Sequence, residues 1–218
     1  MANPTSEPRS VALPSAMPLA RRALLATVIA CLAAPRLAFA QAGTEGARSF
    51  IDKLAEEALA IIRSSGSATE DRRKRFNDLF LRAFDVQAIG RFVLGRHWSR
   101  LKPDEQEQFL KVMGEYVAGI YAAQFADYKG YAFRTTGGRA TGEGETLVPA
   151  QIDREGQQPI RMEFRVRQTE SPKIIDVSVE NVSLILTKRD EFSPTLTREG
   201  VDGVIKRMQA VIDNTARG

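Results

Sequence analysis

Few side chains in this sequence could carry chemistry. His97 is the sole histidine among 218 residues, and the sole cysteine is Cys31, near the N-terminus. A histidine metal cluster is therefore impossible, and a Ser-His-Asp system could use only His97. Because His97 lies beside Trp98 in a polar connection, we do not expect it to be catalytic.

A carboxylate pair is the second candidate for chemistry. Asp176 and Glu180 share one face of a predicted strand, with Ser178 between them, and such a pair could do acid–base work. Because they lie on a strand face, we expect these carboxylates to be solvated or to pair with groups in a turn. The glycines at Gly137–Gly138 and Gly142–Gly144 follow predicted strands, but neither a P-loop lysine nor a helix start comes after them. We expect no catalytic residue, no metal site and no cofactor.

The first 40 residues predict a secretory signal peptide. Arg21 and Arg22 precede an apolar run, Ala23–Ala34, and Ala38–Ala40 supplies an A-x-A cleavage site. The apolar run is too short to span a membrane. Paired arginines also suit a twin-arginine address, so the sequence leaves open whether export uses the Sec or the Tat route.

Cleavage after the leader would change the charge of the chain. The leader holds four Arg and one Glu, so residues 41–218 keep 27 basic and 26 acidic residues. This balance does not argue for a nucleic-acid partner. The mature chain would also lack cysteine, which suits a periplasmic protein that is stable without disulfides. We expect residues 41–218 to form one domain and to be a monomer.

Helical periodicity dominates the first part of the mature chain. Apolar residues from Ala47 predict a helix that is closed by Gly66. Thr69 can cap a second helix, and Asp85 a short third helix that ends at Gly95. These three segments would each bury one apolar face.

A fourth helix, about Pro103–Tyr128, begins with a proline suited to its first turn. Apolar residues cover more than half of its circumference, whereas a surface helix needs a single apolar stripe. We therefore predict that it packs across the concave face of a sheet, with Met113, Tyr116 and Val117 toward Met162 and Phe164.

The second part of the chain predicts an antiparallel meander. Tyr131–Thr136 and Thr146–Asp153 read as strands, and Pro159–Gln168 and Lys173–Leu186 alternate apolar and polar residues as a hairpin does. Its inner face would carry Ile160, Met162, Phe164 and Val166 beside Ile175, Val177 and Val179.

Two more helical stretches complete the prediction. Lys188–Phe192 begins a helix that Ser193-Pro194 can cap and restart. Thr197–Gly200 forms a turn, and Val201–Asp213 forms the last helix. Segregated helices and strands indicate an α+β fold. We expect helices packed around a curved antiparallel sheet of about four strands, enclosing an apolar cavity.

Two segments carry a resemblance to a known family. Leu94-Gly95-Arg96-His97-Trp98, followed by Glu105-Gln106 and Phe109, resembles a signature of the MlaC family, also called the toluene-tolerance auxiliary family. Ile175–Leu184, followed by Arg189, Phe192 and Gly200, resembles a second signature of that family. The resemblance covers roughly Phe50–Ile212.

This chain departs from the family pattern at two positions. Pro172 stands where the family tends to have an aromatic residue, and Asn181 stands where it usually has glycine. A glycine there indicates a backbone position with positive φ, which asparagine tolerates better than most residues. The bend can therefore survive the replacement.

The resemblance implies a periplasmic carrier that shuttles glycerophospholipids. The partners it implies are the lipid-binding subunit of an inner-membrane ABC transporter and an outer-membrane lipoprotein–porin complex. We hypothesise that acyl chains contact an apolar wall on the strands and a second wall on the helices. The strand residues are Met162, Phe164, Val166, Val177 and Val179. The helical residues are Val93, Trp98, Phe109, Met113, Tyr116 and Val117.

Three alternatives remain open at this point. Some relatives accompany hopanoid pathways, so a hopanoid or another apolar lipid could be the ligand. An enzyme on a similar scaffold would need polar groups that converge inside the pocket, whereas the inward positions named above are apolar. A structural or adaptor protein would share the fold and fill its core.

The leader makes a prediction about the mature N-terminus. We expect N-terminal sequencing of the exported protein to begin at Gln41, because the A-x-A site ends at residue 40. Cys31 follows a sequence that loosely resembles a lipoprotein processing site. A mature protein that begins at Cys31 and carries lipid would contradict the expectation of a soluble carrier.

Overall fold

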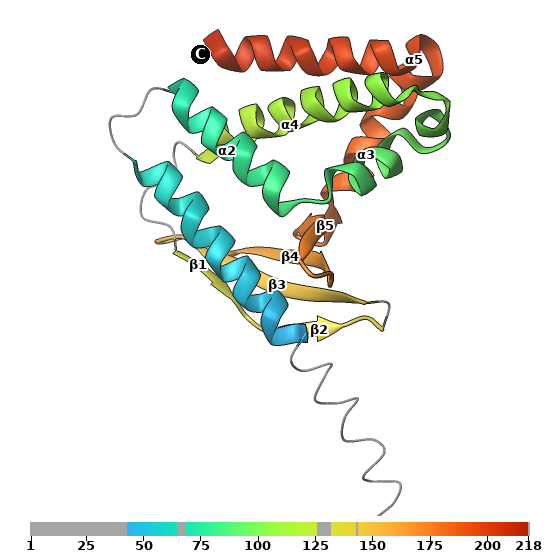
Figure 1. The fold of residues 1–218 in the computed structure, drawn as a ribbon. Coiled ribbons are helices and arrows are strands. Elements are labelled where there is room, and N and C mark those ends of the chain that lie inside the picture. The colour runs from blue at the N-terminus through green and yellow to red at the C-terminus, as the bar shows by residue number, and fades with distance from the viewer. Residues whose placement is uncertain (1–42, 65–68, 126–131, 143, 218) are drawn as a thin grey trace, which may run out of the picture. The chain divides into compact units, whose positions relative to one another are not determined.

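The structure is a computed structural model that describes residues 43–64, 69–125, 132–142 and 144–217 (Figure 1). The helices are residues 43–63, α2 (Thr69–Ala83), α3 (Val86–Leu94), the 3-10 helix η1 (Gly95–Arg100), α4 (Pro103–Phe125) and α5 (Leu184–Arg217). The strands are β1 (Ala132–Thr135), β2 (Arg139–Ala140), β3 (Glu145–Asp153), β4 (Ile160–Arg167), β5 (Lys173–Val179) and β6 (Val182–Ser183). Among the described helices, none is both long and apolar enough to cross a membrane.

Local sequence signals account for the ends of α3. The Asp85 carboxylate accepts a hydrogen bond from the Ala88 N–H at 3.0 Å, as an N-cap residue does. Gly95 ends the helix with φ of 51°, a left-handed conformation that is penalised for residues with a Cβ atom. Both ends of this helix confirm the interpretation of the sequence.

The strands form one antiparallel sheet in the order β1-β3-β4-β5-β6, with β2 also paired to β3. The α+β class and the hairpin of β4 and β5 are therefore confirmed. Asn181 lies in the turn after β5 with φ of 66°, so the positive φ expected from the glycine of related sequences is present here.

A β-bulge changes which residues face inward on β5. Arg165 pairs with Asp176, but Val166 pairs with Ile174, so Ile175 is an extra residue on β5. The prediction that Ile175 shares the inner face with Val166 is wrong. Ile174 takes that place and is fully buried.

The buried apolar side chains of the described residues form three clusters. The sheet cluster comprises Ala47, Ile51, Val148, Ala150, Phe164, Val166, Ile174 and Val177. The third cluster, between helix 43–63, α2 and α4, comprises Ile61, Phe76, Leu79 and Ala118. The helical cluster is the largest and comprises Ile89, Val93, Leu94, Trp98, Phe109, Val112, Met113, Tyr116, Phe192, Leu196, Val204, Met208 and Ile212.

The position of α4 differs from the prediction. This helix packs against α2, α3 and α5, and its residues Met113 and Tyr116 belong to the helical cluster. The apolar face of the sheet packs instead against Ala47 and Ile51 of helix 43–63. Apolarity on both sides of α4 thus reflects burial among helices. The predicted residues 126–128 at its end lie outside the described residues.

The course of α5 agrees with the predicted turn at Thr197–Gly200 and differs from the prediction at Ser193-Pro194. The helix begins at Leu184 and continues through Pro194, so no cap or restart occurs at Ser193-Pro194. Gly200 interrupts it with φ of 71° and ψ of −163°. The direction change between the two arms of α5 therefore falls at this glycine, which tolerates positive φ without steric cost.

Contacts around Phe84 and Asp85 join the helices to β5. Phe84 forms a bridge to Ile174, and the Asp85 N–H donates to the Ile174 carbonyl at 2.9 Å. The Arg167 guanidinium on β4 donates to the Asp85 carboxylate at 2.9 Å. Lys173 also donates to the carbonyl of Arg82 at the end of α2. Phe84 packs against both the helical and the sheet clusters.

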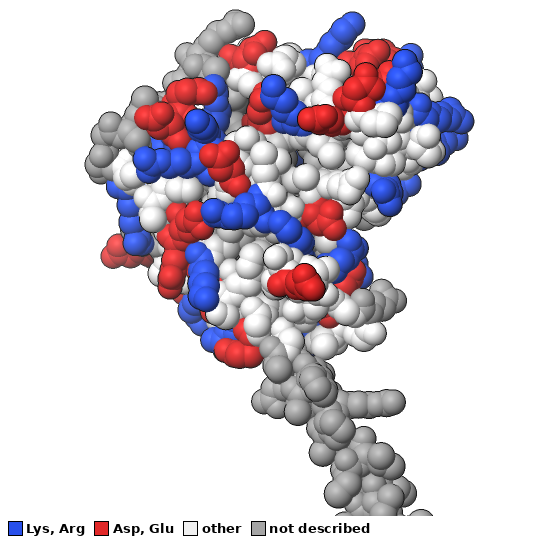
Figure 2. All heavy atoms as spheres, viewed as in Figure 1, with Lys and Arg blue, Asp and Glu red and all other residues white. Residues whose placement is uncertain are grey.

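Charged side chains of both signs are interleaved over the face shown in Figure 2. The outer face of the sheet also carries charges of both signs. The Arg165 guanidinium lies 2.7 Å from the Glu145 carboxylate, and Arg167 lies 3.6 Å from it. These ion pairs show that the polar residues of β4 lie on the outer face, as the alternating sequence predicts.

The junction at Asp85 can be tested by two substitutions. Asp85→Ala removes both the N-cap and the ion pair with Arg167, and should lower the free energy of unfolding by about 1–2 kcal/mol. Asp85→Asn keeps an amide that can cap the helix and loses only a partly exposed ion pair, worth about 0–1 kcal/mol. Urea denaturation measures both; equal losses would contradict a capping role.

Candidate functional site

Burial of the inner face of the sheet changes from one end to the other. At the first end, Thr146, Val166 and Ile174 are paired across β3, β4 and β5, and all three are fully buried. In the next row of paired residues, Val148, Phe164 and Val177 are also buried, and all three belong to the sheet cluster. We call this part the sealed end.

The other end of the same face is only partly covered. Met162 pairs with Val179, and Val179 with Val182. Met162 and Val179 are half-buried, whereas Val182 is 56% exposed. The register adds Phe133, Ile152 and Ile160 to this inner face, and all three are half-buried. We call these six residues the open end: Phe133, Ile152, Ile160, Met162, Val179 and Val182.

Apolar surface left in water at the open end is energetically unfavourable. Burying it would stabilise the protein by about 25 cal/mol for each Å² removed from water. An apolar ligand could supply that burial without displacing the packed side chains of the sealed end. The open end is therefore the candidate binding surface.

The helical residues predicted for the site lie elsewhere. Val93, Trp98, Phe109, Met113 and Tyr116 are buried in the helical cluster, and Val117 packs against it. Met162, Phe164, Val166, Val177 and Val179 instead form or flank the sheet cluster. The structure therefore divides the predicted residues between two clusters, which Phe84 connects.

Tyr116 has polar contacts that its place in the sequence does not reveal. Its ring lies 6.0 Å from the Phe192 ring, and its hydroxyl accepts a hydrogen bond from Lys188 at 3.0 Å. The Lys188 ammonium also donates to Glu191 at 2.7 Å. Partial burial acts to lower the pKa of Lys188, but these two hydrogen bonds outweigh it and raise the pKa above its usual value.

Asp176 and Glu180 do not act as a pair. The Asp176 carboxylate accepts from the Ser183 hydroxyl at 2.7 Å and lies 3.4 Å from the Ile185 N–H, so it supports the start of α5. Glu180 accepts from the Arg161 N–H at 2.8 Å and from its guanidinium at 3.0 Å. These bonds, the backbone one first, lower the pKa of Glu180. His97 is half-buried in η1.

Charged groups near the open end are paired with one another. Besides Arg161 and Glu180, the Arg134 guanidinium donates to Asp153 at 2.8 Å. The bonds from Arg134 and then from Gln151 lower the pKa of Asp153. Within the described ranges, no group of His, Cys, Asp and Glu could hold a metal ion.

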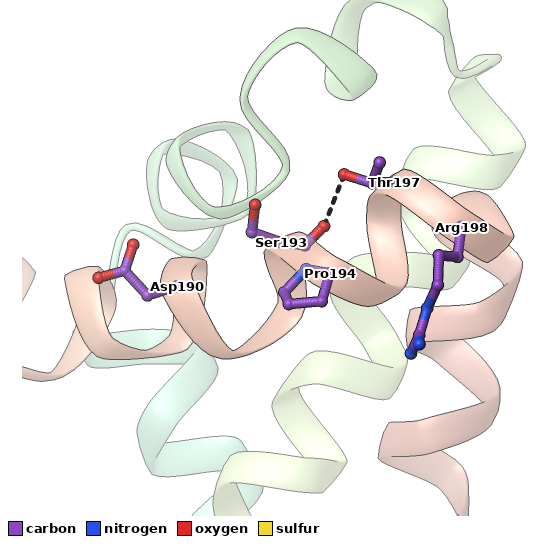
Figure 3. A pocket seen from close by; sticks show the side chains of 5 residues that line it. All are labelled: Asp190, Ser193, Pro194, Thr197 and Arg198. Carbon is purple, nitrogen blue, oxygen red and sulfur yellow. Dashed lines mark hydrogen bonds between the residues drawn. The ribbon is translucent and has the colours of Figure 1, made fainter.

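A separate recess opens on the surface of α5 (Figure 3). Its volume is about 490 Å³, and its lining combines a carboxylate, two hydroxyls, a proline and a guanidinium, from Asp190, Ser193, Pro194, Thr197 and Arg198. The Thr197 hydroxyl donates to the Ser193 carbonyl at 2.9 Å. This open, mixed surface does not match the apolar cavity predicted between sheet and helices.

Part of the open end was not predicted as a site. Ile152 and Phe133 lie on strands where alternation of Val148, Ala150 and Ile152 could have identified the inner face. Val182 follows the bend at Asn181, and only its pairing with Val179 places it on that face. The difference in burial between the sealed end and the open end cannot be recognised in the sequence.

Comparison with known proteins gives two findings. The sequence model of a family described as MlaC protein matches residues 52–210. The structure of a phospholipid-binding protein from Ralstonia solanacearum, in complex with a phospholipid, is similar with a TM-score of 0.69 and 18% sequence identity. The similarity covers 78% of this chain and 98% of that protein. At this identity it shows a shared fold.

The two ends of the sheet face should respond differently to a larger side chain. Val166→Trp would overpack a fully buried position and should cost about 1–3 kcal/mol or more of unfolding free energy. Met162→Trp at the open end should cost less than about 1 kcal/mol, because the site is only half-buried. Equal losses in thermal or urea denaturation would show that the open end is ordinary core.

Proposed function

This chain belongs to the MlaC family, and we propose that it is a periplasmic phospholipid-binding protein that holds its ligand by the acyl chains. The family match supports the class of protein. The phospholipid in the similar structure from Ralstonia solanacearum supports the class of ligand. The predicted signal peptide supports the periplasmic location.

The observation that carries the proposal is the graded burial of the sheet face. A compact domain normally has one contiguous apolar core with smaller satellite clusters. Here the sheet and helical clusters are distinct and share Phe84 at their edges, and the inner face of the sheet is only half-buried at Met162 and Val179. An apolar ligand laid along the open end would complete the burial that the protein's own side chains leave unfinished.

The energetics of phospholipid transport give such a surface its use. Each methylene group removed from water is worth about 0.8 kcal/mol, so exposing two acyl chains costs on the order of 20 kcal/mol. A lipid that leaves a membrane therefore needs an apolar container. The acyl chains would contact Met162 and Val179, while the sealed end and the helical cluster keep the domain folded in the absence of ligand.

The charges at the open end suit a ligand held by its apolar part. Arg161 is paired with Glu180, and Arg134 with Asp153, so neither cation is free to select an anionic headgroup. Binding would depend on chain length and volume more than on headgroup chemistry. No catalytic step is proposed: His97 is the sole histidine, and the sole cysteine belongs to the predicted leader.

The proposed carrier would move phospholipid between two membranes. Its partners would be the lipid-binding subunit of an inner-membrane ABC transporter and an outer-membrane lipoprotein–porin complex. Membership of the MlaC family supports both partners. The proposed carrier would act as a monomer, with each ligand enclosed within one chain.

Lipid content measures the proposed function directly. Organic extraction of the purified protein followed by mass spectrometry should detect phospholipid at close to one molecule per protein. Met162→Trp should lower the lipid bound per folded molecule several-fold, because the indole ring occupies the space of an acyl chain. Glu163→Trp is the matched control, since Glu163 is the next residue of β4 and points to the opposite face.

Two results would contradict the proposal. One is a folded protein that contains no lipid and takes none up from phospholipid vesicles. The other is an equal loss of lipid in the Met162 and Glu163 variants, which would place the ligand away from the inner face of the sheet. If the extract contained a hopanoid instead of a phospholipid, the proposed carrier function would stand and its ligand would be a hopanoid.

A further inference from the structure

An exposed patch lies where α3 meets the first part of α5. Phe92 is 38% exposed and Leu186 is 49% exposed, which makes them two of the few large apolar residues that reach the surface of the described chain. Arg91, Arg96 and Arg189 are also exposed. We call these five residues the basic-apolar patch: Arg91, Phe92, Arg96, Leu186 and Arg189.

The contacts of Arg189 show that the two elements form one surface. Its guanidinium lies 4.9 Å from the centre of the Phe92 ring. The same guanidinium is the nearest neighbour of the place where a Cβ atom on Gly95 would lie, at 3.7 Å. Leu186 precedes Arg189 by three residues on α5, so the two side chains share one face of that helix. Phe92 and Leu186 therefore flank Arg189.

The charge of the patch has one sign on the α3 side. Residues 86–103 contain Arg91, Arg96, Arg100 and Lys102 and no acidic residue. Among the ion pairs of the described residues, none includes Arg91, Arg96 or Arg189. This distinguishes the patch from Arg134, Arg161 and Arg165, which are all paired.

Acidic residues near the patch are few and mostly engaged. Glu191 is bound to Lys188 at 2.7 Å and lies 3.8 Å from Arg207. Asp190 is exposed beside Arg189 and lines the recess on α5. Glu105, at the start of α4, accepts a hydrogen bond from the Lys102 N–H at 2.7 Å. The three arginines of the patch thus exceed its one free neighbouring carboxylate, that of Asp190.

We propose that the basic-apolar patch docks the protein on the surface of an anionic phospholipid bilayer. A bilayer presents diffuse negative charge, which attracts exposed cations without fixed geometry, and an interface where aromatic side chains are favourable. Unpaired arginines around an exposed Phe92 match both properties. A protein partner would instead bind through carboxylates at fixed positions, which form ion pairs buried from water in a pocket of the interface. The exposed patch does not provide such a pocket.

This docking surface goes beyond the proposed function and does not depend on it. The open end of the sheet concerns the ligand inside the protein, whereas the patch concerns the surface on which the protein comes to rest. A protein that carries no lipid could still bind vesicles through the patch, and a carrier could still lack it.

The experiment is sedimentation of the purified protein with vesicles of phosphatidylcholine, with or without phosphatidylglycerol. We expect binding only to the vesicles that contain phosphatidylglycerol, and loss of binding when salt is raised from about 0.1 M to about 1 M. Arg91→Glu with Arg96→Glu should weaken binding by about tenfold or more. Phe92→Ala should weaken it by about threefold through loss of interfacial contact.

Matched controls lie on α2. Lys74→Glu with Arg75→Glu changes the net charge of the protein by the same amount at exposed positions. Leu81→Ala removes an apolar side chain that is 39% exposed, close to the exposure of Phe92. Both controls should bind vesicles like the parent protein. Thermal denaturation of each variant confirms that it is folded.

Three outcomes would overturn the proposal. These are no binding to vesicles that contain phosphatidylglycerol, equal binding to phosphatidylcholine alone, and equal loss of binding in the α2 controls. The third outcome would show that net charge or the basic run of α2 is responsible. Lipid extracted from the same samples reports separately on the proposed carrier function, so the two failures are distinguishable.

Discussion

Across the described part of this protein, the buried apolar side chains are divided among three clusters and do not form one continuous core. Packing of the sealed end and of the helical cluster supplies the stability of the fold, since buried aliphatic and aromatic side chains each contribute about 1.5–3 kcal/mol. Helix 43–63 connects the sheet cluster to the third cluster, because Ala47 and Ile51 pack on the sheet while Ile61 packs on α2 and α4. The open end is the part that this arrangement leaves uncovered.

Strand β5 carries two of the polar junctions between the sheet and the helices. At its beginning, the Ile174 carbonyl accepts from Asp85 at the start of α3. Further along, Asp176 accepts from Ser183 where α5 begins. A strand with hydrogen-bonded neighbours can hold helix starts at fixed places, whereas side-chain packing alone would allow them to slide. The geometry of the region beside the open end therefore depends on this strand.

Electrostatics are divided between paired and unpaired charges. Arginines on the outer face of the sheet pair with Glu145, Asp153 or Glu180. The pairs with Asp153 and Glu180 are exposed and contribute little to stability individually, whereas the Glu145 side chain is only 10% exposed. Their effect is to leave the sheet surface without a dominant sign of charge. Among the ion pairs of the described residues, none includes Arg91, Arg96 or Arg189, so the basic-apolar patch keeps an excess of positive charge that can attract an anionic surface over about a Debye length.

Features that depend on near neighbours along the chain could be predicted from the amino-acid sequence alone. Asp85 and Gly95 define the ends of α3, and alternation from Ile160 to Val166 defines a strand with one apolar face, because caps and pleats act over a few residues. The signatures around Trp98 and Asp176 were enough to indicate the family. The helices that cover α4 could be identified only from the three-dimensional structure, since apolar residues on both sides of a helix require burial but do not indicate which elements bury them. The structure was likewise needed to show that Ile174 rather than Ile175 faces inward, because a bulge is a mismatch between two strands. Met162 and Val179 were predicted as site residues together with Val166, but the sequence could not show that the face is open at the first two and sealed at the third. Exposure depends on what lies opposite a residue in space, and the chain's own periodicity is the same at both ends of the sheet.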